Sequence, residues 1–98
     1  MDRHHVNTAE AKEVLSAHLG RYRESPYDRL VERIGSQDTA EELGPTGVAY
    51  QLEFMFEWDD KPGGCVRVLG CVDDGGWRAF KPLCDDFIRA PDGSFVDE

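Results

Sequence analysis

The sequence predicts a single α+β domain in which two N-terminal helices pack on one face of an antiparallel meander of three or four strands. Apolar residues recur at helical spacing up to residue 35. Every second residue from Val48 to Trp58 is apolar, and clusters of Gly, Pro and Asp separate the later apolar runs. A chain of 98 residues can bury a core without added crosslinks. We expect residues 1–6 to be flexible, 7–35 to form the helical half and 36–98 the sheet half.

The first helix is predicted to begin near Asn7 or Thr8, either of which can cap it. Glu10 stands three residues after Asn7, in the capping-box position. The following residues form an apolar stripe at helical spacing: Ala11, Val14, Leu15, His18, Leu19 and Tyr22. Gly20 either ends this helix or only weakens it. We interpret His18 as a packed residue at the edge of the core rather than as a catalytic base.

A second, shorter helix is predicted with Ser25 as its cap and Pro26 at its first helical position. Four residues form its apolar side: Tyr27, Leu30, Val31 and Ile34. Gly35 ends it. The stripes of both helices need cover, and the aromatic face of the predicted sheet can provide it.

The sheet is organised around the strand from Val48 to Trp58. β-Branched and aromatic residues are frequent in it, which favours a strand over a helix. Residues 38–43 are either an earlier strand or a helical turn. We favour the strand because Gly44–Gly47 resembles a hairpin loop between two runs.

Two further runs, residues 65–72 and 77–83, follow the organising strand after dense turn signals. Pro82 cannot donate a ladder hydrogen bond, so the run that contains it is an edge strand or pairs only briefly. Residues 84–89 are interpreted as a further short strand or a turn.

The apolar pattern also predicts the register of the central strands. Pairing Trp58 with Val66 brings three more apolar pairs onto the same face: Phe56 with Val68, Phe54 with Gly70, and Leu52 with Val72. The glycine in this set lets the facing ring cover bare backbone. Pairing Val72 with Trp77 would extend this face onto the third run.

The net charge of −9 is unevenly distributed. Residues 1–35 sum to zero, and residues 36–98 carry the whole excess of acidic side chains. An acidic sheet repels phosphate backbones, so nucleic-acid binding is not expected. A basic protein partner or a divalent cation suits this half better. The alternative is that the charge serves only solubility.

A cytoplasmic location without a membrane span is predicted. No apolar run approaches the roughly 20 residues that a spanning helix needs, and the N-terminal residues do not form an apolar signal segment. The three cysteines are an odd number, which favours reduced thiols. Cys65 and Cys84 are expected near the same end of the sheet. No Cys-x-x-Cys spacing indicates zinc, and no cofactor is expected.

The turns and the strands beside them share a set of sequence signals: Gly44–Gly47, Tyr50, Trp58–Gly64, Asp73–Phe80, Pro82-Leu83 and Ala90–Phe95. In these segments the chain resembles a family of short, uncharacterised bacterial proteins. The resemblance covers residues 44–95 well and the helices loosely. It implies a similar fold and no particular activity.

Four carboxylates form a candidate cation site: Asp59, Asp60, Asp85 and Asp86. If the last two return to the end of the sheet that holds the first two, their hard oxygen ligands suit Ca²⁺ or Mg²⁺. The chain would then be a divalent-cation-dependent small-molecule binder or hydrolase. The alternative is turn chemistry, because Asp commonly bonds its own backbone in turns.

A row of apolar side chains, Met55, Leu69 and Phe80, is expected across three strands on the face opposite the aromatic residues. Arg67, which lies opposite Glu57 in the predicted register, and Arg78 would border it. An apolar strip with a charged border is typical of a protein interface. The alternative is that C-terminal apolar residues cover the row: Phe87, Ile88 and Phe95.

No nucleophilic triad and no phosphate-binding loop is visible in the sequence. The leading hypothesis is therefore a non-catalytic interaction or accessory module, with an unknown protein partner or a second copy of the chain as its ligand. The cation-dependent binder or hydrolase is the second hypothesis.

Overall fold

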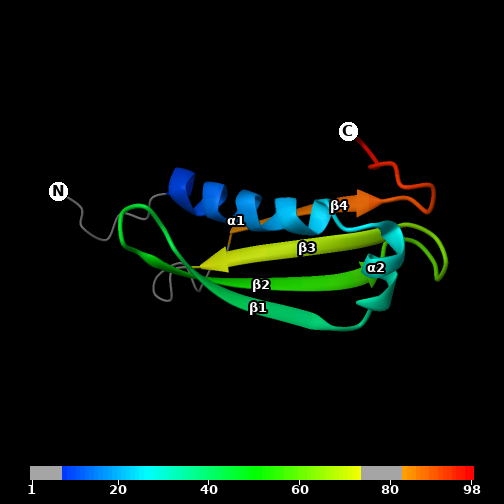
Figure 1. Cartoon of the computed structure of the whole chain (residues 1–98), viewed down its shortest axis with the longest axis horizontal. Helices are drawn as coiled ribbons and strands as arrows, with labels where there is room; N and C mark the ends of the chain where they lie inside the picture. Colours follow the sequence, from blue (N-terminus) through cyan, green and yellow to red (C-terminus); the bar gives the residue numbers. More distant parts are fainter. Residues whose placement is uncertain (1–7, 74–82) are drawn as a thin grey trace.

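The computed structural model describes residues 8–73 and 83–98. The elements in chain order are α1 (Thr8–Arg23), α2 (Tyr27–Glu32), β1 (Gln37–Leu43), β2 (Ala49–Trp58), β3 (Val66–Asp73) and β4 (Leu83–Arg89). The strands form one antiparallel sheet in the order β1-β2-β3-β4. Helix α1 lies along the sheet, mainly over β3 and β4, and α2 lies at one end (Figure 1). The predicted α+β meander is confirmed.

Helix α1 is held to the sheet by the stripe predicted from the sequence. Ala11, Leu15 and Leu19 are buried, and α1 continues through Gly20 to Arg23. The expected flexible residues 1–6 and the expected cap Asn7 lie outside the described residues.

Helix α2 begins one residue later than the sequence predicts. Pro26 is the N-cap and not the first helical residue, because its backbone is extended at φ −68° and ψ 157°. Its carbonyl accepts hydrogen bonds from the backbone of Arg29 at 3.0 Å and Leu30 at 3.3 Å. The carbonyl of Ser25 instead accepts a bond from the Arg89 side chain at 2.9 Å. Leu30 is the buried anchor of this short helix.

The first hairpin and the central register agree with the prediction. β1 pairs with β2, and the backbone N–H of Gly44 donates to the carbonyl of Val48 at 2.8 Å across the turn. Gly47 adopts φ +90°, a conformation that favours glycine. Between β2 and β3, the four pairs proposed for the aromatic face are all present.

The strand that pairs with the far side of β3 differs from the prediction. Val72 lies opposite Leu83, whereas the sequence predicts Trp77 there. Trp77, Phe80 and Pro82 lie outside the described residues. The aromatic residues favoured the earlier run by propensity, but β4 meets the core through Phe87, which is buried opposite Val68. Tertiary burial outweighs local β-propensity here.

The hydrophobic core lies between the helices and one face of the sheet. It comprises Ala11, Leu15, Leu19, Leu30, Tyr50, Leu52, Phe54, Phe56, Val66, Val68, Val72 and Phe87. Tyr22 covers part of its border: its ring centroid lies 5.0 Å from that of Phe54 and 5.3 Å from that of Phe56. The apolar residues that occupy every second position of β2 thus all lie on the face that the helices cover.

Within residues 8–73 and 83–98, no helix is both long and apolar enough to cross a membrane.

Candidate functional site

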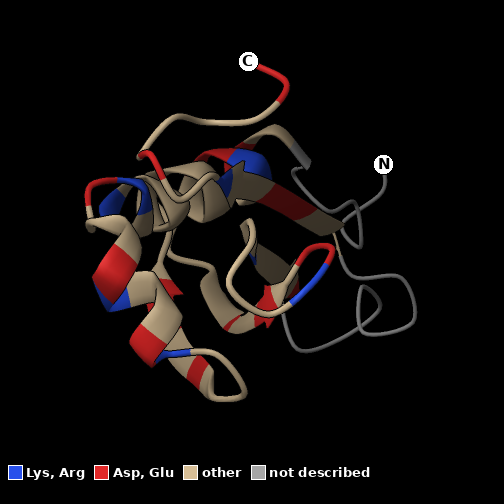
Figure 2. Ribbon diagram, turned by 90° about the vertical axis from the view of Figure 1, so that its right-hand side faces the viewer, with Lys and Arg blue, Asp and Glu red and all other residues tan. Residues whose placement is uncertain are grey.

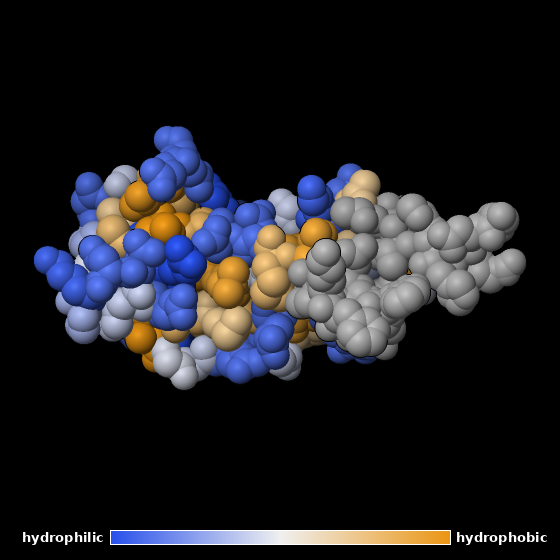
Figure 3. All heavy atoms as spheres, turned by 180° about the vertical axis from the view of Figure 1, so that it is seen from behind, coloured by the Kyte–Doolittle hydropathy of each residue, from blue (hydrophilic) through white to orange (hydrophobic). Residues whose placement is uncertain are grey.

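The face of the sheet that points away from the helices is called the outer face here. Its residues on β1 to β4 are Gln37, Thr39, Glu41, Leu43, Ala49, Gln51, Glu53, Met55, Glu57, Arg67, Leu69, Cys71, Asp73, Cys84, Asp86 and Ile88. Seen from behind, the molecule shows apolar surface interrupted by hydrophilic side chains (Figure 3). The carboxylates of Glu53 and Glu57 belong to exposed residues, so this face is in contact with solvent along β2.

The predicted apolar row is present in part. Met55 and Leu69 are direct cross-strand partners on the outer face, and both are half-buried. The next position along the row, on β4, is Asp86 and not Phe80. Phe80 and Arg78 lie outside the described residues. Two adjacent apolar side chains therefore face a carboxylate on the neighbouring strand.

The C-terminal segment does not cover this row in the way the alternative required. Phe87 is 3% exposed and belongs to the core on the helix side. The Phe95 ring packs against the Phe87 ring with centroids 5.9 Å apart, and the Arg23 guanidinium lies 4.2 Å from the Phe95 centroid. Ile88 does lie on the outer face, opposite Arg67. The C-terminal aromatic residues close the end of the helix layer and leave Met55 and Leu69 accessible.

Arg67 is a cation among carboxylates on the outer face. It lies opposite Glu57 as predicted, and its guanidinium contacts Asp59 at 3.5 Å and Asp86 at 3.4 Å. The side chains of these two pairs are partly exposed, so each pair adds little stability. The arrangement fixes Arg67 at the border of the apolar pair and leaves Glu53 and Glu57 to set the negative potential around Met55.

A shallow hollow opens beside Met55. Its volume is about 470 Å³, and Ile34, Trp58 and Glu57 also line it. It lies where the chain enters β1 and where β2 ends. A side chain of a partner could enter it between apolar walls and a carboxylate.

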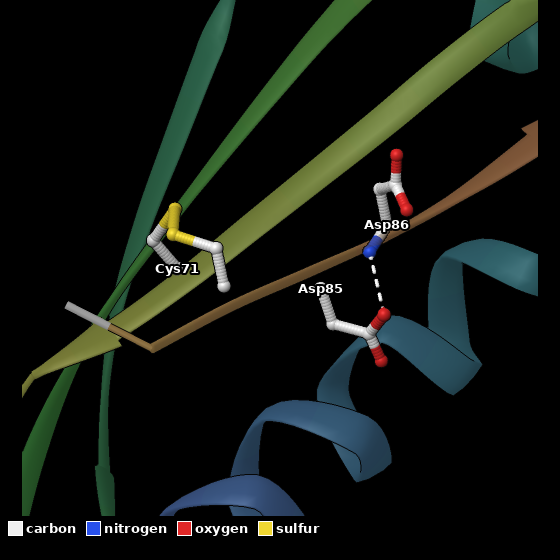
Figure 4. Close-up of a disulfide and its surroundings, with 4 residues drawn as sticks. Cys71, Asp85 and Asp86 are labelled. Carbon is white, nitrogen blue, oxygen red and sulfur yellow. Dashed lines mark hydrogen bonds between the residues drawn. A yellow bond between two sulfur atoms is a disulfide. The ribbon is translucent and has the colours of Figure 1, made fainter.

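The predicted cation site is not assembled. Asp60 uses Oδ1 to accept bonds from the backbone of Lys61 at 2.7 Å and Cys65 at 3.3 Å, which is the turn chemistry considered as the alternative. Asp85 and Asp86 lie in β4, where Asp85 points toward α1 and Asp86 points away from it (Figure 4). Within the described ranges, no three His, Cys, Asp or Glu side chains are grouped to hold a metal ion.

The expectation of reduced thiols is wrong for two of the cysteines. Cys71 and Cys84 form a disulfide on the outer face, between residues that are direct partners of β3 and β4 with Cα atoms 4.0 Å apart (Figure 4). The predicted proximity of Cys65 to Cys84 depended on a third strand that ended near residue 83. Once β4 begins at Leu83, Cys84 lies opposite Cys71 instead.

Cys65 is the free cysteine, and it is half-buried. Burial raises the pKa of its thiol, and the negative charges of Asp60 and Asp59 raise the pKa further. The thiolate is the reactive form of cysteine, and these surroundings disfavour it. Cys65 is therefore poorly suited to nucleophilic chemistry.

A buried carboxylate that the sequence assigns to helix capping has a second role. Glu10 is 5% exposed and accepts hydrogen bonds from Tyr50 Oη at 2.7 Å, Thr46 Oγ1 at 2.8 Å and the Thr46 backbone N–H at 3.0 Å. The Tyr50 bond first, then the Thr46 bonds, hold the pKa of Glu10 below its usual value. The sequence offers one signal for this contact: Tyr50 places a hydroxyl group at the end of the apolar face of β2, where it needs a hydrogen-bond partner. Glu10 ties α1 to the first hairpin.

His18 is a packed residue, as predicted. Its ring stacks on Phe54 with centroids 4.8 Å apart and planes tilted by 17°. Its Nδ1 lies 3.3 Å from a carboxylate oxygen of Glu42. Its ring is half-buried at the edge of the core and also lines a surface hollow with Ala17 and Glu42.

Comparison of the chain with family models, with curated proteins and with solved structures returned no match. The resemblance to a family of short bacterial proteins stays a prediction.

Proposed function

We propose that this protein is a non-catalytic interaction module that binds a basic protein through the outer face of its sheet. The observation that carries the proposal is the pair Met55 and Leu69, which lie side by side on a face that the helices leave open. Glu53, Glu57 and Asp86 border this pair. Partly accessible apolar residues inside a charged border are typical of protein interfaces.

The shape of the surface supports a docking role over a catalytic one. The hollow beside Met55 is shallow and suits a single anchoring side chain. Met55 is unbranched and adaptable, so it can repack around such an anchor. The reactive groups nearest to it are carboxylates and Arg67, which already contacts two of those carboxylates.

Charge indicates the class of the partner. The chain carries a net charge of −9, and acidic positions occur on the helices, the strands and the turn between β2 and β3 (Figure 2). Such a field speeds the approach of a basic protein and opposes a phosphate backbone. It also opposes a second copy of the chain, because the same carboxylates would meet. We therefore favour a basic protein over a homodimer or a nucleic acid.

The proposal is tested by placing charge on the apolar pair. The double variant Met55→Glu and Leu69→Glu is compared with the wild type in affinity capture from the host's lysate, with mass spectrometry to identify bound proteins. We expect a basic protein that wild type retains and the variant loses. Light scattering on the purified proteins measures self-association in parallel.

The matched control is Ala17→Glu, which adds a carboxylate to an exposed position on α1. It should retain the partner. Circular dichroism must show that all variants keep the fold. If the double variant is folded and its bound proteins and mass equal those of wild type, the outer face is not the interface.

The cation-dependent alternative is weaker because its four carboxylates do not converge. Asp60 is occupied by its own turn, Asp59 and Asp86 contact Arg67, and Asp85 faces the helix side. A melting temperature that rises in millimolar Ca²⁺ or Mg²⁺ would restore it.

A cytoplasmic location stays a prediction, and the Cys71–Cys84 disulfide weighs against it. Disulfides persist in oxidising compartments and are rare in reducing ones. Alkylation of free thiols in intact host cells distinguishes the two cases. Only Cys65 reacts in an oxidising compartment, whereas all the cysteines react in a reducing one.

A further inference from the structure

The two edges of the sheet differ in what covers them. At β4, the C-terminal segment returns to the edge: Val96 N–H donates to the Ile88 carbonyl at 2.9 Å, and Arg89 forms a bridge with Phe95. β1 pairs with β2 on one side only. In the described part of the chain, no backbone hydrogen bond reaches the other side of Gln37–Leu43. Among residues 8–73 and 83–98, this side of β1 is thus an edge without a strand partner, and the N–H and C=O groups of such an edge can template a further strand.

The helix-side carboxylates of this edge are already engaged. Asp38 accepts a hydrogen bond from Tyr22 Oη at 2.7 Å and pairs with Arg33. Burial and the bond to Asp38 raise the pKa of Tyr22 to about 12, so the hydroxyl stays a donor. Glu42 lies beside His18. These contacts hold β1 against the helices. An added strand would therefore be recognised by the side chains of the outer face.

On the outer face, the carboxylates at the edge have neutral hydrogen-bond donors as partners among the described residues. Glu41 accepts a bond from the Gln51 side chain at 2.8 Å, and Glu53 accepts one from Gln37 at 2.5 Å. The donors are neutral amides, so neither of these hydrogen bonds neutralises a negative charge. Glu57 continues the row along β2. Among the described residues of the sheet, the basic side chain on this face that lies nearest to the edge is Arg67, two strands away.

The charges select the kind of strand that can be added. A second copy of β1 would bring Asp38, Glu41 and Glu42 against their own equivalents, and like charges across a strand pair are destabilising. A strand with Lys or Arg on one face would instead place cations beside Glu41 and Glu53. Such an addition supplies backbone hydrogen bonds for affinity and alternate side chains for specificity.

The end of the edge is apolar. Leu43 is 72% exposed and Val48 is 39% exposed, and they flank the turn that joins β1 to β2. An apolar residue at one end of the added strand would cover them and fix its register.

We infer that the open edge of β1 accepts an extended basic segment of the partner as a fifth strand, with cations toward Glu41 and Glu53 and an apolar residue toward Leu43. This inference rests on the proposed function, since it names how part of the basic partner would be held. It also adds a contact surface beyond Met55 and Leu69.

The probe is a synthetic peptide as long as β1, which has 7 residues. It alternates Lys and Val and ends in Leu, and a matched peptide carries Glu in place of Lys. Binding is followed by nuclear magnetic resonance, with amide hydrogen exchange as the decisive readout. We expect the Lys peptide to slow exchange at alternate amides of Gln37–Leu43, because those amides point to the open edge. The Glu peptide should leave them unchanged.

Charge reversal provides the second arm. Glu41→Lys with Glu53→Lys should weaken binding of the Lys peptide by about tenfold or more, since its cations would meet a positive charge at Glu41 on the neighbouring strand β1 and another at Glu53 on β2 beyond it. Glu24→Lys with Asp28→Lys makes the same change of net charge at two exposed positions, one in the turn after α1 and one on α2. This control should bind nearly as well as wild type.

Each contrary result has a defined meaning. Equal binding of both peptides, no binding of either, or an equal loss in both charge variants overturns the inference. Binding of the Lys peptide that perturbs Met55 and Leu69 without protecting β1 amides also overturns it, while the proposed outer-face interface survives. A partner captured from lysate that is insensitive to Met55→Glu and Leu69→Glu removes the proposed function, and the peptide experiment is then judged on its own.

Discussion

Phe54 and Met55 are neighbours in β2 but lie in opposite surroundings. Phe54 is 0% exposed, with the rings of His18 and Tyr22 against it. Met55 is on the outer face, between its cross-strand partners Leu69 and Gln37. The comparison of the two faces shows that the helix face carries the packing of the domain. The outer face can change its side chains at low cost, which is what a binding surface requires.

The largest difference in stability is expected when Phe54 and Met55 are each replaced by alanine. Phe54→Ala should lower the free energy of unfolding by about 3–5 kcal/mol, because it leaves a cavity in a closed core. Met55→Ala, at a half-buried outer position, should cost about 1 kcal/mol or less. Urea unfolding followed by tryptophan fluorescence measures both. Equal losses would mean that the outer face is as tightly packed as the core.

The outer face makes one large contribution to stability, through the disulfide. Replacing Cys71 and Cys84 by Ser opens a crosslink between positions separated by 13 residues. The closed loop predicts a loss of about 3 kcal/mol, mainly because the unfolded chain gains freedom. A reductant should lower the melting temperature of wild type and leave that of the double variant unchanged. A wild type insensitive to full reduction would contradict this.

A smaller effect is expected where β3 passes beneath Phe54. A Cβ on Gly70 would lie 2.6 Å from Cε1 of Phe54 and 3.0 Å from Cδ1 of Leu15. Gly70→Ala should therefore destabilise by about 1–3 kcal/mol through overpacking.

Gly20 provides the matched control for that substitution. It lies inside α1, and a Cβ there would meet no atom within 4 Å. Gly20→Ala should stabilise the domain by about 1 kcal/mol, because alanine favours the helix. The same chemical change would thus have opposite signs at the two sites. A loss at Gly20 would indicate that α1 needs flexibility there.

The parts of the fold that were predictable from the sequence are those written in a local pattern. The alternation along β2 determines which side chains face the helices, and the apolar matches with β3 select one register, including Phe54 over Gly70. Helix α1 and the first hairpin follow from periodicity and turn residues. These signals lie within or between adjacent segments.

The parts that were missed depend on where the chain re-enters the sheet after β3. The aromatic residues Trp77 and Phe80 led to a strand being predicted over residues 77–83. The strand that pairs with the far side of β3 is instead Leu83–Arg89, so every residue of β3 has a different partner on that side from the predicted one. Cys84 came to face Cys71, and Asp86 came to face Leu69. The contact of Glu10 with Tyr50 joins residues 40 apart in sequence, which no local pattern encodes. The pair Met55 and Leu69 and the place of Arg67 opposite Glu57 were therefore predictable, and the place of Asp86 beside Leu69 was not.

The smallest expected effect, and the most selective, concerns the carboxylate that joins the helix face to the first hairpin. Because the folded pKa of Glu10 lies below its usual value of 4.5, its contribution to stability is present above that value and is lost as pH falls through the folded pKa. Asp92 and Glu98 also have lowered pKa values, through Ser94 and Arg23, and add to the same acid response. Glu10→Gln should therefore melt lower than wild type at pH 7, and the difference should shrink as pH falls below 4.5.

Tyr50→Phe removes the strongest of its hydrogen bonds and should raise the pKa of Glu10 toward 4.5, which carbonyl-carbon nuclear magnetic resonance can follow directly. Asp92→Asn, on the C-terminal turn, is the control that alters the acid response without touching this contact. Parallel melting curves for wild type and Glu10→Gln across this pH range would show that the buried carboxylate does not link α1 to the hairpin.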